Sequence, residues 1–160
     1  MKTKNSKAEP GDLRERALGY LARREHSRLE LARKLAQAGF DEAEVRTLLD
    51  DFEQKNWLSD RRFAESWVAD HRAKAGSVKL AFDLRQRGVS DAIIEAVLGE
   101  NRDSEVERAR DVWRKKFAGP PIDAADKARQ MRFLQSRGFT SEVIRRVMAD
   151  GTSRRPEFTE

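Results

Sequence analysis

The chain has no cysteine among its 160 residues. This absence excludes a disulfide framework, a thiolate metal site and a thiol nucleophile, and it suits a protein of the reducing cytosol. Long apolar runs are also missing, and the basic, polar start MKTKNSKAEPG is not followed by the apolar segment of a secretion signal. We therefore expect a cytoplasmic protein that does not enter a membrane.

Motifs that carry chemistry are missing too. No segment reads G-x-x-x-x-G-K-[ST] or G-x-G-x-x-G, the glycine patterns that cradle phosphates, so nucleotide hydrolysis is not indicated. The two histidines, His26 and His71, are far apart and lack the spacing of metal ligands, and we expect structural or solvated roles for both. The sequence therefore predicts a protein that is not an enzyme and holds no cofactor or metal.

Charge is abundant. The chain carries 33 lysines and arginines against 28 acidic residues, which gives a net charge of +5, and 14 of those basic residues fall between 101 and 160. Such a balance permits binding to nucleic acid without requiring it.

One sequence motif, called the phrase below, occurs three times. It reads LAQAGFDEAEV at 35–45, LRQRGVSDAII at 84–94 and LQSRGFTSEVI at 134–144. In each copy a glycine follows an apolar pattern of helical spacing, which predicts a helix that ends with its glycine in the left-handed conformation. The phrase therefore predicts a corner between two helices, and its central residues are Gly39, Phe40, Gly88, Val89, Gly138 and Phe139.

The residues after each corner predict the start of the next helix. Asp41, Ser90 and Thr140 are good N-caps, because their side-chain oxygens accept backbone N–H groups that have no partner within the helix. The large apolar residue before each cap has the spacing of a hydrophobic staple to a β-branched residue four positions after the cap, namely Val45, Ile94 or Ile144.

The corners recur at intervals of about 50 residues, within the range of helical repeat arrays. We predict an all-α fold of three tandem three-helix repeats that share buried surface in an elongated, curved array, whose handedness the sequence does not reveal. The predicted repeats are 12–58, 59–101 and 102–150, between disordered tails at 1–11 and 151–160. The predicted helices are 13–24, with Asp12 as its cap, 28–38, 42–55, 60–74, 77–87, 91–99, 104–117, 124–137 and 141–149.

Three longer runs resemble the RecX family, the regulatory proteins that modulate the bacterial recombinase RecA. They are YLARREHSRLELARKLAQAGF, in which Ser27 and Glu30 have capping-box spacing, LSDRRFAESWVADHRAKAGSVKLAFDLRQRGVSDAII, and MRFLQSRGFTSEVIRRVM. The resemblance spans about residues 13 to 150, and Lys79 stands where the family pattern favours arginine.

The resemblance implies a protein that binds the RecA filament on DNA, lies along its helical groove and restrains strand exchange, coupled ATP hydrolysis and filament growth. It implies no catalytic residue. We expect a monomer that contacts single-stranded DNA more weakly on its own than on the filament. The alternative is a helical repeat protein that binds nucleic acid without sequence specificity.

Basic residues of repeats two and three are the candidates for the partner or DNA contact. Lys79 and Arg87 occupy the same repeat positions as Arg129 and Arg137, and no acidic residue lies between 127 and 141, so few intramolecular partners are expected there. Phe82 is apolar where the other repeats have arginine, which favours either packing between repeats or an anchor for the partner. The full candidate set is Arg72, Lys74, Lys79, Phe82, Arg87, Arg129, Arg132 and Arg137.

Overall fold

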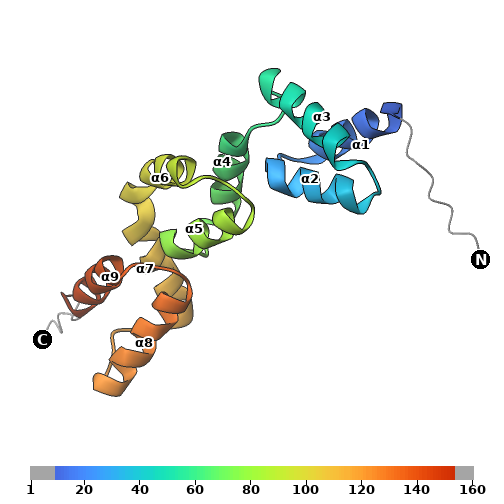
Figure 1. Cartoon of the computed structure of the whole chain (residues 1–160). Helices are drawn as coiled ribbons and strands as arrows, with labels where there is room; N and C mark the ends of the chain where they lie inside the picture. The colour runs from blue at the N-terminus through green and yellow to red at the C-terminus, as the bar shows by residue number, and fades with distance from the viewer. Residues whose placement is uncertain (1–9, 154–160) are drawn as a thin grey trace, which may run out of the picture. The chain divides into compact units, whose positions relative to one another are not determined.

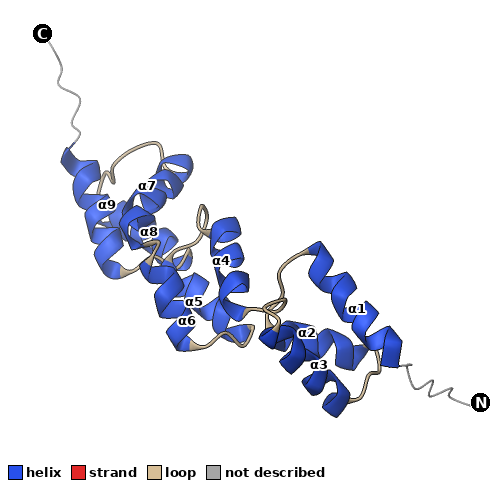
Figure 2. Cartoon of the chain, turned by 90° about the horizontal axis from the view of Figure 1, so that it is seen from above, coloured by secondary structure: helices blue, strands red, loops and turns tan. Residues whose placement is uncertain are grey.

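The structure, a computed structural model, describes residues 10–153, and within that range it contains helices and loops and no strand (Figures 1 and 2). The predicted all-α class is confirmed. The helices are α1 (Pro10–Arg23), α2 (Arg28–Gln37), α3 (Glu42–Gln54), α4 (Asp60–His71), α5 (Ser77–Gln86), α6 (Asp91–Gly99), α7 (Glu105–Lys116), α8 (Ala124–Ser136) and α9 (Ser141–Ser153), with a short 3-10 turn, η1 (Arg102–Ser104), before α7.

The helix ends differ from the prediction mainly at three places. α1 begins at Pro10, so Asp12 lies in its first turn and is not its cap as predicted. Proline suits this position because it has a fixed φ and its missing N–H would have no partner in the first turn. α4 ends at His71, three residues early, and α9 continues to Ser153. The rest of the two predicted tails, residues 1–9 and 154–160, lies outside the described residues.

All three corners have the predicted construction. Gly39, Gly88 and Gly138 have φ values of +93°, +79° and +85°, a region that other residues rarely adopt. Each glycine N–H donates to the carbonyl three residues back, at 3.0, 3.0 and 2.9 Å. The next N–H donates to the leucine carbonyl five residues back, at 3.2, 3.1 and 3.3 Å. This pair of hydrogen bonds is the Schellman motif, which ends a helix on a left-handed residue.

The predicted caps are also present. Asp41 accepts the N–H of Glu44 at 3.2 Å, Ser90 that of Ile93 at 3.4 Å, and Thr140 that of Val143 at 3.3 Å. The apolar residues assigned to the staples are all buried, namely Phe40, Val45, Val89, Ile94, Phe139 and Ile144.

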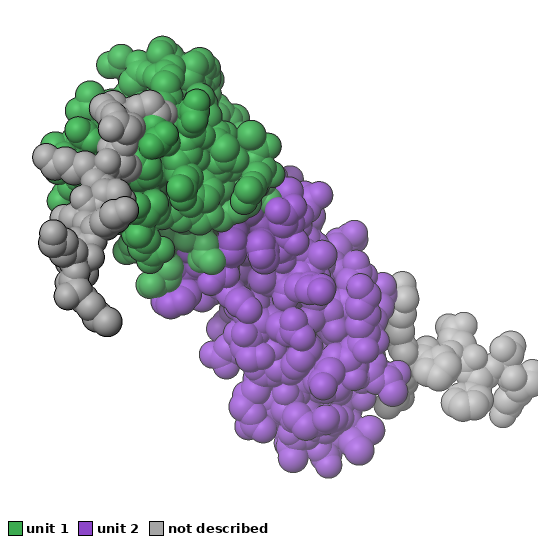
Figure 3. Space-filling view, turned by 90° about the vertical axis from the view of Figure 1, so that its right-hand side faces the viewer, with its two compact units in different colours: residues 1–66, 84–93 green, residues 67–83, 94–160 purple. Residues whose placement is uncertain are grey.

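Contacts divide the chain into two compact units (Figure 3). Unit 1 holds residues 1–66 and 84–93, and unit 2 holds residues 67–83 and 94–160, so the predicted middle repeat contributes to both. The core of unit 1 is built from apolar residues of α1 to α3, and that of unit 2 from α7 to α9. No helix of the described chain is long and apolar enough to span a membrane.

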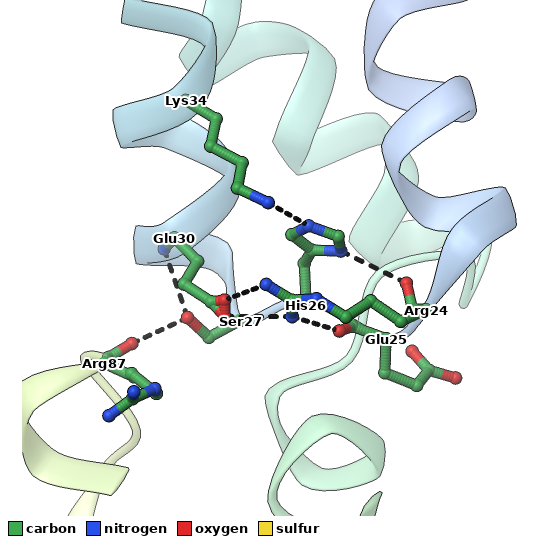
Figure 4. Close-up of polar contacts among 7 residues, drawn as sticks. All are labelled: Arg24, Glu25, His26, Ser27, Glu30, Lys34 and Arg87. Carbon is green, nitrogen blue, oxygen red and sulfur yellow. Dashed lines mark hydrogen bonds and ion pairs between the residues drawn. The ribbon is translucent and has the colours of Figure 1, made fainter. Parts of the chain in front are cut away.

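Within unit 1, the start of α2 is held by residues from much later in the sequence. The carboxylate of Asp60, in the first turn of α4, accepts the N–H of Arg28 at 2.8 Å. Ser27 caps α2 and also donates its hydroxyl to the carbonyl of Arg87 at 2.7 Å, just before Gly88 (Figure 4). A Cβ on Gly88 would lie 2.7 Å from the Cβ of Leu29, so this helix start abuts the glycine corner.

Within unit 2, the start of α5 is held in the same way. The carboxylate of Glu105, the first residue of α7, accepts the N–H of Ser77 at 2.9 Å. Gly76 N–H donates to the carbonyl of Arg137 at 2.8 Å, and Val78 N–H donates to that of Gly138 at 3.0 Å. We call these two arrangements joints: in each, a middle helix starts against the next glycine corner and receives a carboxylate from the next first helix.

Candidate binding site

Lys79 and Arg137 meet at the joint in unit 2. A Cβ on Gly138 would clash with the backbone nitrogen of Lys79 at 2.6 Å, so the first turn of α5 lies directly on the end of α8. The Lys79 side chain is exposed and that of Arg137 is half-buried. Lys79 and Arg137 thus flank the same glycine, which leaves room for the helix start, although they are 58 positions apart in the sequence.

Arg129 on α8 and Arg137, the C-cap residue of that helix, lie on one stripe with Phe133, because successive members are four residues apart. The Arg137 guanidinium lies 5.2 Å from the centre of the Phe133 ring, and that of Arg129 lies 5.2 Å from the Phe117 ring. The two rings meet edge to face with centroids 5.4 Å apart. Stacking on a ring positions a guanidinium while its N–H edge stays available for an anion. Phe117 and Phe133 were not among the predicted site residues, although Phe133 stands four residues from each arginine.

The expectation that Arg129 has few partners was wrong. Its guanidinium makes an ion pair with Asp126 at 2.7 Å, and this hydrogen bond is the main cause that lowers the pKa of the Asp126 carboxyl. The stretch free of acidic residues begins at 127, and Asp126 lies just outside it, one helical turn before Arg129.

The other predicted cations of the described chain have different surroundings from Lys79 and Arg137. Arg132 lies about 100° around α8 from Phe133, away from the stripe. Arg72 donates to the side chain of Asn101 at 3.3 Å, and its carbonyl accepts from Arg108 at 2.8 Å. Arg87 belongs to unit 1, and Lys74 is exposed in the loop before α5.

Phe82 does not lie in the core. It is 58% exposed, and Val78, one turn earlier on α5, is 57% exposed. Single exposed apolar side chains are ordinary on a protein surface, but this pair forms a ridge beside Lys79. We call Val78, Lys79, Phe82 and Arg137 the α5 face.

His26 has a structural role, as expected. It is 1% exposed, its Nδ1 faces the carbonyl of Arg24 at 3.1 Å, and its Nε2 faces the Lys34 ammonium at 2.8 Å (Figure 4). Because an ammonium only donates, Nε2 accepts and the proton of the neutral ring sits on Nδ1. Burial lowers the pKa of His26, and the charges of Arg24 and Lys34 lower it further.

Half of the predicted capping box is present beside it. Ser27 accepts the N–H of Glu30 at 3.1 Å, but the Glu30 carboxylate pairs with Arg24 instead of returning to the Ser27 backbone. In residues 10–153 there is no group of three potential metal-ligating side chains.

Models of a known family match the chain in three places. They are described as the first, second and third three-helix domains of RecX, and they match residues 14–52, 59–98 and 103–148. "Regulatory protein RecX" from Chromobacterium violaceum is 48% identical over 145 residues, which cover 90% of this chain and 93% of that relative. The protein of the same name from Ralstonia nicotianae is 44% identical over 140 residues, with 88% of each chain covered.

Solved structures share the fold. The crystal structure of RecX from Lactobacillus salivarius superposes with a TM-score of 0.80 at 20% identity and covers 91% of this chain and 97% of its own. A second crystal structure, of regulatory protein RecX, gives a TM-score of 0.76 at 20% identity and covers 88% of this chain and 73% of its own. With three consecutive domain matches and relatives this similar over nearly their whole length, the chain belongs to the RecX family of regulatory proteins.

Proposed function

We propose that this protein binds the RecA filament on DNA, lies along its helical groove and inhibits strand exchange, coupled ATP hydrolysis and filament extension. The observation that carries the proposal is membership of a family whose proteins are named regulatory. The protein acts by binding and performs no chemistry of its own.

The α5 face supports a contact of mixed character. Phe82 and Val78 offer exposed apolar area that a protein pocket can bury, and truncation of such a central aromatic anchor is costly in many interfaces. Lys79 and Arg137 lie beside this ridge and suit phosphates or acidic side chains. A filament of protein on DNA offers both kinds of group, whereas bare DNA lacks the protein pocket.

The test measures the DNA-dependent ATPase and strand exchange of RecA with substoichiometric amounts of this protein. We expect the parent to inhibit both activities and Phe82→Ala to inhibit them markedly less while its thermal midpoint is unchanged. Leu18→Ala is the matched control, since Leu18 is also an exposed apolar residue, 37% exposed, but lies in unit 1. Full activity of RecA in the presence of the parent would refute the proposal.

The alternative, a nucleic-acid-binding repeat protein, predicts a different preference. It should bind bare strands as tightly as RecA-coated strands, with a steep dependence on salt. The proposed regulator should bind coated strands much more tightly. Titration of labelled single strands, bare and coated, at two salt concentrations separates the two.

A further inference from the structure

The two joints define what a glycine corner of this chain accommodates. At Gly88 and Gly138 the neighbour is the first turn of a helix, and the carbonyl just before each glycine accepts a hydrogen bond from the residue that directly precedes that helix, Ser27 or Gly76. In both joints a carboxylate near the start of the adjacent first helix accepts a backbone N–H of the same turn. Corner and carboxylate together form the receiving half of a joint.

The first repeat has a receiving half that no helix start of the described residues occupies. Within residues 10–153, a Cβ on Gly39 would meet no atom within 4 Å, and no donor reaches the carbonyl of Ala38. The first turn of α1 carries an acidic residue, Asp12, as those of α4 and α7 do.

A groove of about 650 Å³ lies next to this corner. It runs between α1 and α3 and begins at Ala43 and Glu44, in the first turn after the corner. Leu13 and Leu48 contribute apolar surface to it.

The last repeat has the other half of a joint. Its middle helix, α8, starts without a glycine corner of the described chain against it. α8 is capped by its own Asp123, which accepts the N–H of Asp126, and no acceptor in the described chain is found for the N–H of Ala124. In the first joint the equivalent N–H, that of Arg28, is the one bound by Asp60. Ile122, just before the cap, is 89% exposed, more than any other large apolar residue described.

We infer that two copies of this chain associate head to tail, with the start of α8 of one copy seated at the Gly39 corner of the next. Ile122 then occupies the groove between α1 and α3, and Asp12 takes the place that Asp60 and Glu105 have in the internal joints. The contact joins two different surfaces, so each copy keeps one of them available for a further copy and a row can form. It is compatible with a monomer in dilute solution, because copies aligned on a shared support meet at a high effective concentration. The contact does not depend on the proposed function.

The absence of cysteine allows a direct test by cross-linking. Ala38→Cys and Ala124→Cys, both at exposed positions, are introduced into one full-length chain, which is treated at high concentration with a short bismaleimide. We expect a ladder of dimers and higher species. An equal mixture of the two single-cysteine chains should give dimers only, and Ala38→Cys alone should give none.

Two further variants show whether the ladder comes from this contact. Gly39→Asn keeps a residue that tolerates positive φ but adds a side chain where the helix start would sit, so it should reduce the ladder roughly tenfold, equivalent to about 1.4 kcal/mol. Ile122→Ser should reduce it similarly without strain, since this side chain is already exposed. A double-cysteine chain that stays monomeric, a ladder that survives both variants, or dimers of Ala38→Cys alone would each overturn the inference. RecA binding, measured separately, can fail or succeed without changing this result.

Discussion

Three glycines with the same local role differ in what surrounds them. All three have positive φ, which their sequence context predicts. Among the described residues no atom lies near the Cβ position of Gly39, whereas Gly88 faces the Cβ and Cδ2 of Leu29, and Gly138 faces the Cβ and the backbone of Lys79. The left-handed conformation therefore explains the glycine at the first corner, whereas the other two also need the absence of a Cβ.

This difference predicts an order of stability for alanine substitutions. Gly39→Ala should cost about 1 to 2 kcal/mol, the penalty of a left-handed residue. Gly88→Ala should cost more, because Leu29 must move, and Gly138→Ala the most, because a backbone must shift. Urea unfolding with a shared m-value measures all three, and equal costs would contradict the assignment of the joints.

His26 predicts a loss of stability in mild acid. Its pKa in the folded chain lies below the ordinary value of 6.5, so the unfolded chain binds the proton more tightly. The contribution of His26 to the free energy of unfolding should be constant above pH 6.5. It should fall as the pH drops from 6.5 to the pKa of His26 in the folded chain, and it should level off below that pKa. His26→Gln should flatten this part of the profile of unfolding free energy against pH. An unchanged slope in His26→Gln would rule out His26 as its source.

At the scale of elements, helix starts are completed by other helices. The first N–H groups of a helix have no partner within it, and here carboxylates from α4 and α7 supply acceptors for α2 and α5. Burial is the main cause that raises the pKa of Asp60, so its ionised form is costly there although it serves as a cap. The cap needs an oxygen acceptor more than it needs a charge.

Asp60 therefore predicts different results for two substitutions. Asp60→Ala should cost about 1 kcal/mol, with a range of about 0.5 to 2, because the N–H of Arg28 is left without its acceptor. Asp60→Asn keeps an oxygen and removes a half-buried charge, so it should cost much less at neutral pH. Thermal unfolding of both variants beside the parent tests this. A large drop in stability in Asp60→Asn would show that charge, not the hydrogen bond, stabilises the joint.

At the scale of the whole molecule, the candidate basic residues are divided between the two units. Most candidates lie in unit 2, and among them only Lys79 and Arg137 meet at the joint beside the ridge of Phe82. Net charge attracts any polyanion weakly, so specificity has to come from a local arrangement of this kind.

We predict that Lys79→Gln with Arg137→Gln weakens binding to RecA-coated single strands and leaves helical content unchanged. If these side chains bind phosphates, removing each one should lower the slope of log affinity against log salt by about 0.7 to 0.9. Arg23→Gln with Arg33→Gln, at two exposed arginines of unit 1, is the matched control and should change affinity less. The same affinity and slope in both double variants would place the binding surface elsewhere.

The sequence by itself determined the helices, their corners and their caps. Each corner is built within one short stretch of sequence. The leucine whose carbonyl accepts a hydrogen bond lies four residues before the left-handed glycine, and the cap of the next helix lies two residues after it, so local chemistry decides the corner. The family followed from the same runs of sequence. Even the pairing of Arg129 with Asp126 is local, because the two residues are three positions apart on α8.

Only the tertiary structure decided what meets the corners and what stays exposed. Ser27 binds the carbonyl of a residue 60 positions away, Asp60 reaches across 32 positions and Glu105 across 28, and no local pattern specifies such pairs. Phe82 shows the same limit, because an apolar residue on a helix is compatible with a core or with a surface until its neighbours are placed. Exposure is a property of the packed chain, since it depends on side chains that are distant in sequence and close in space.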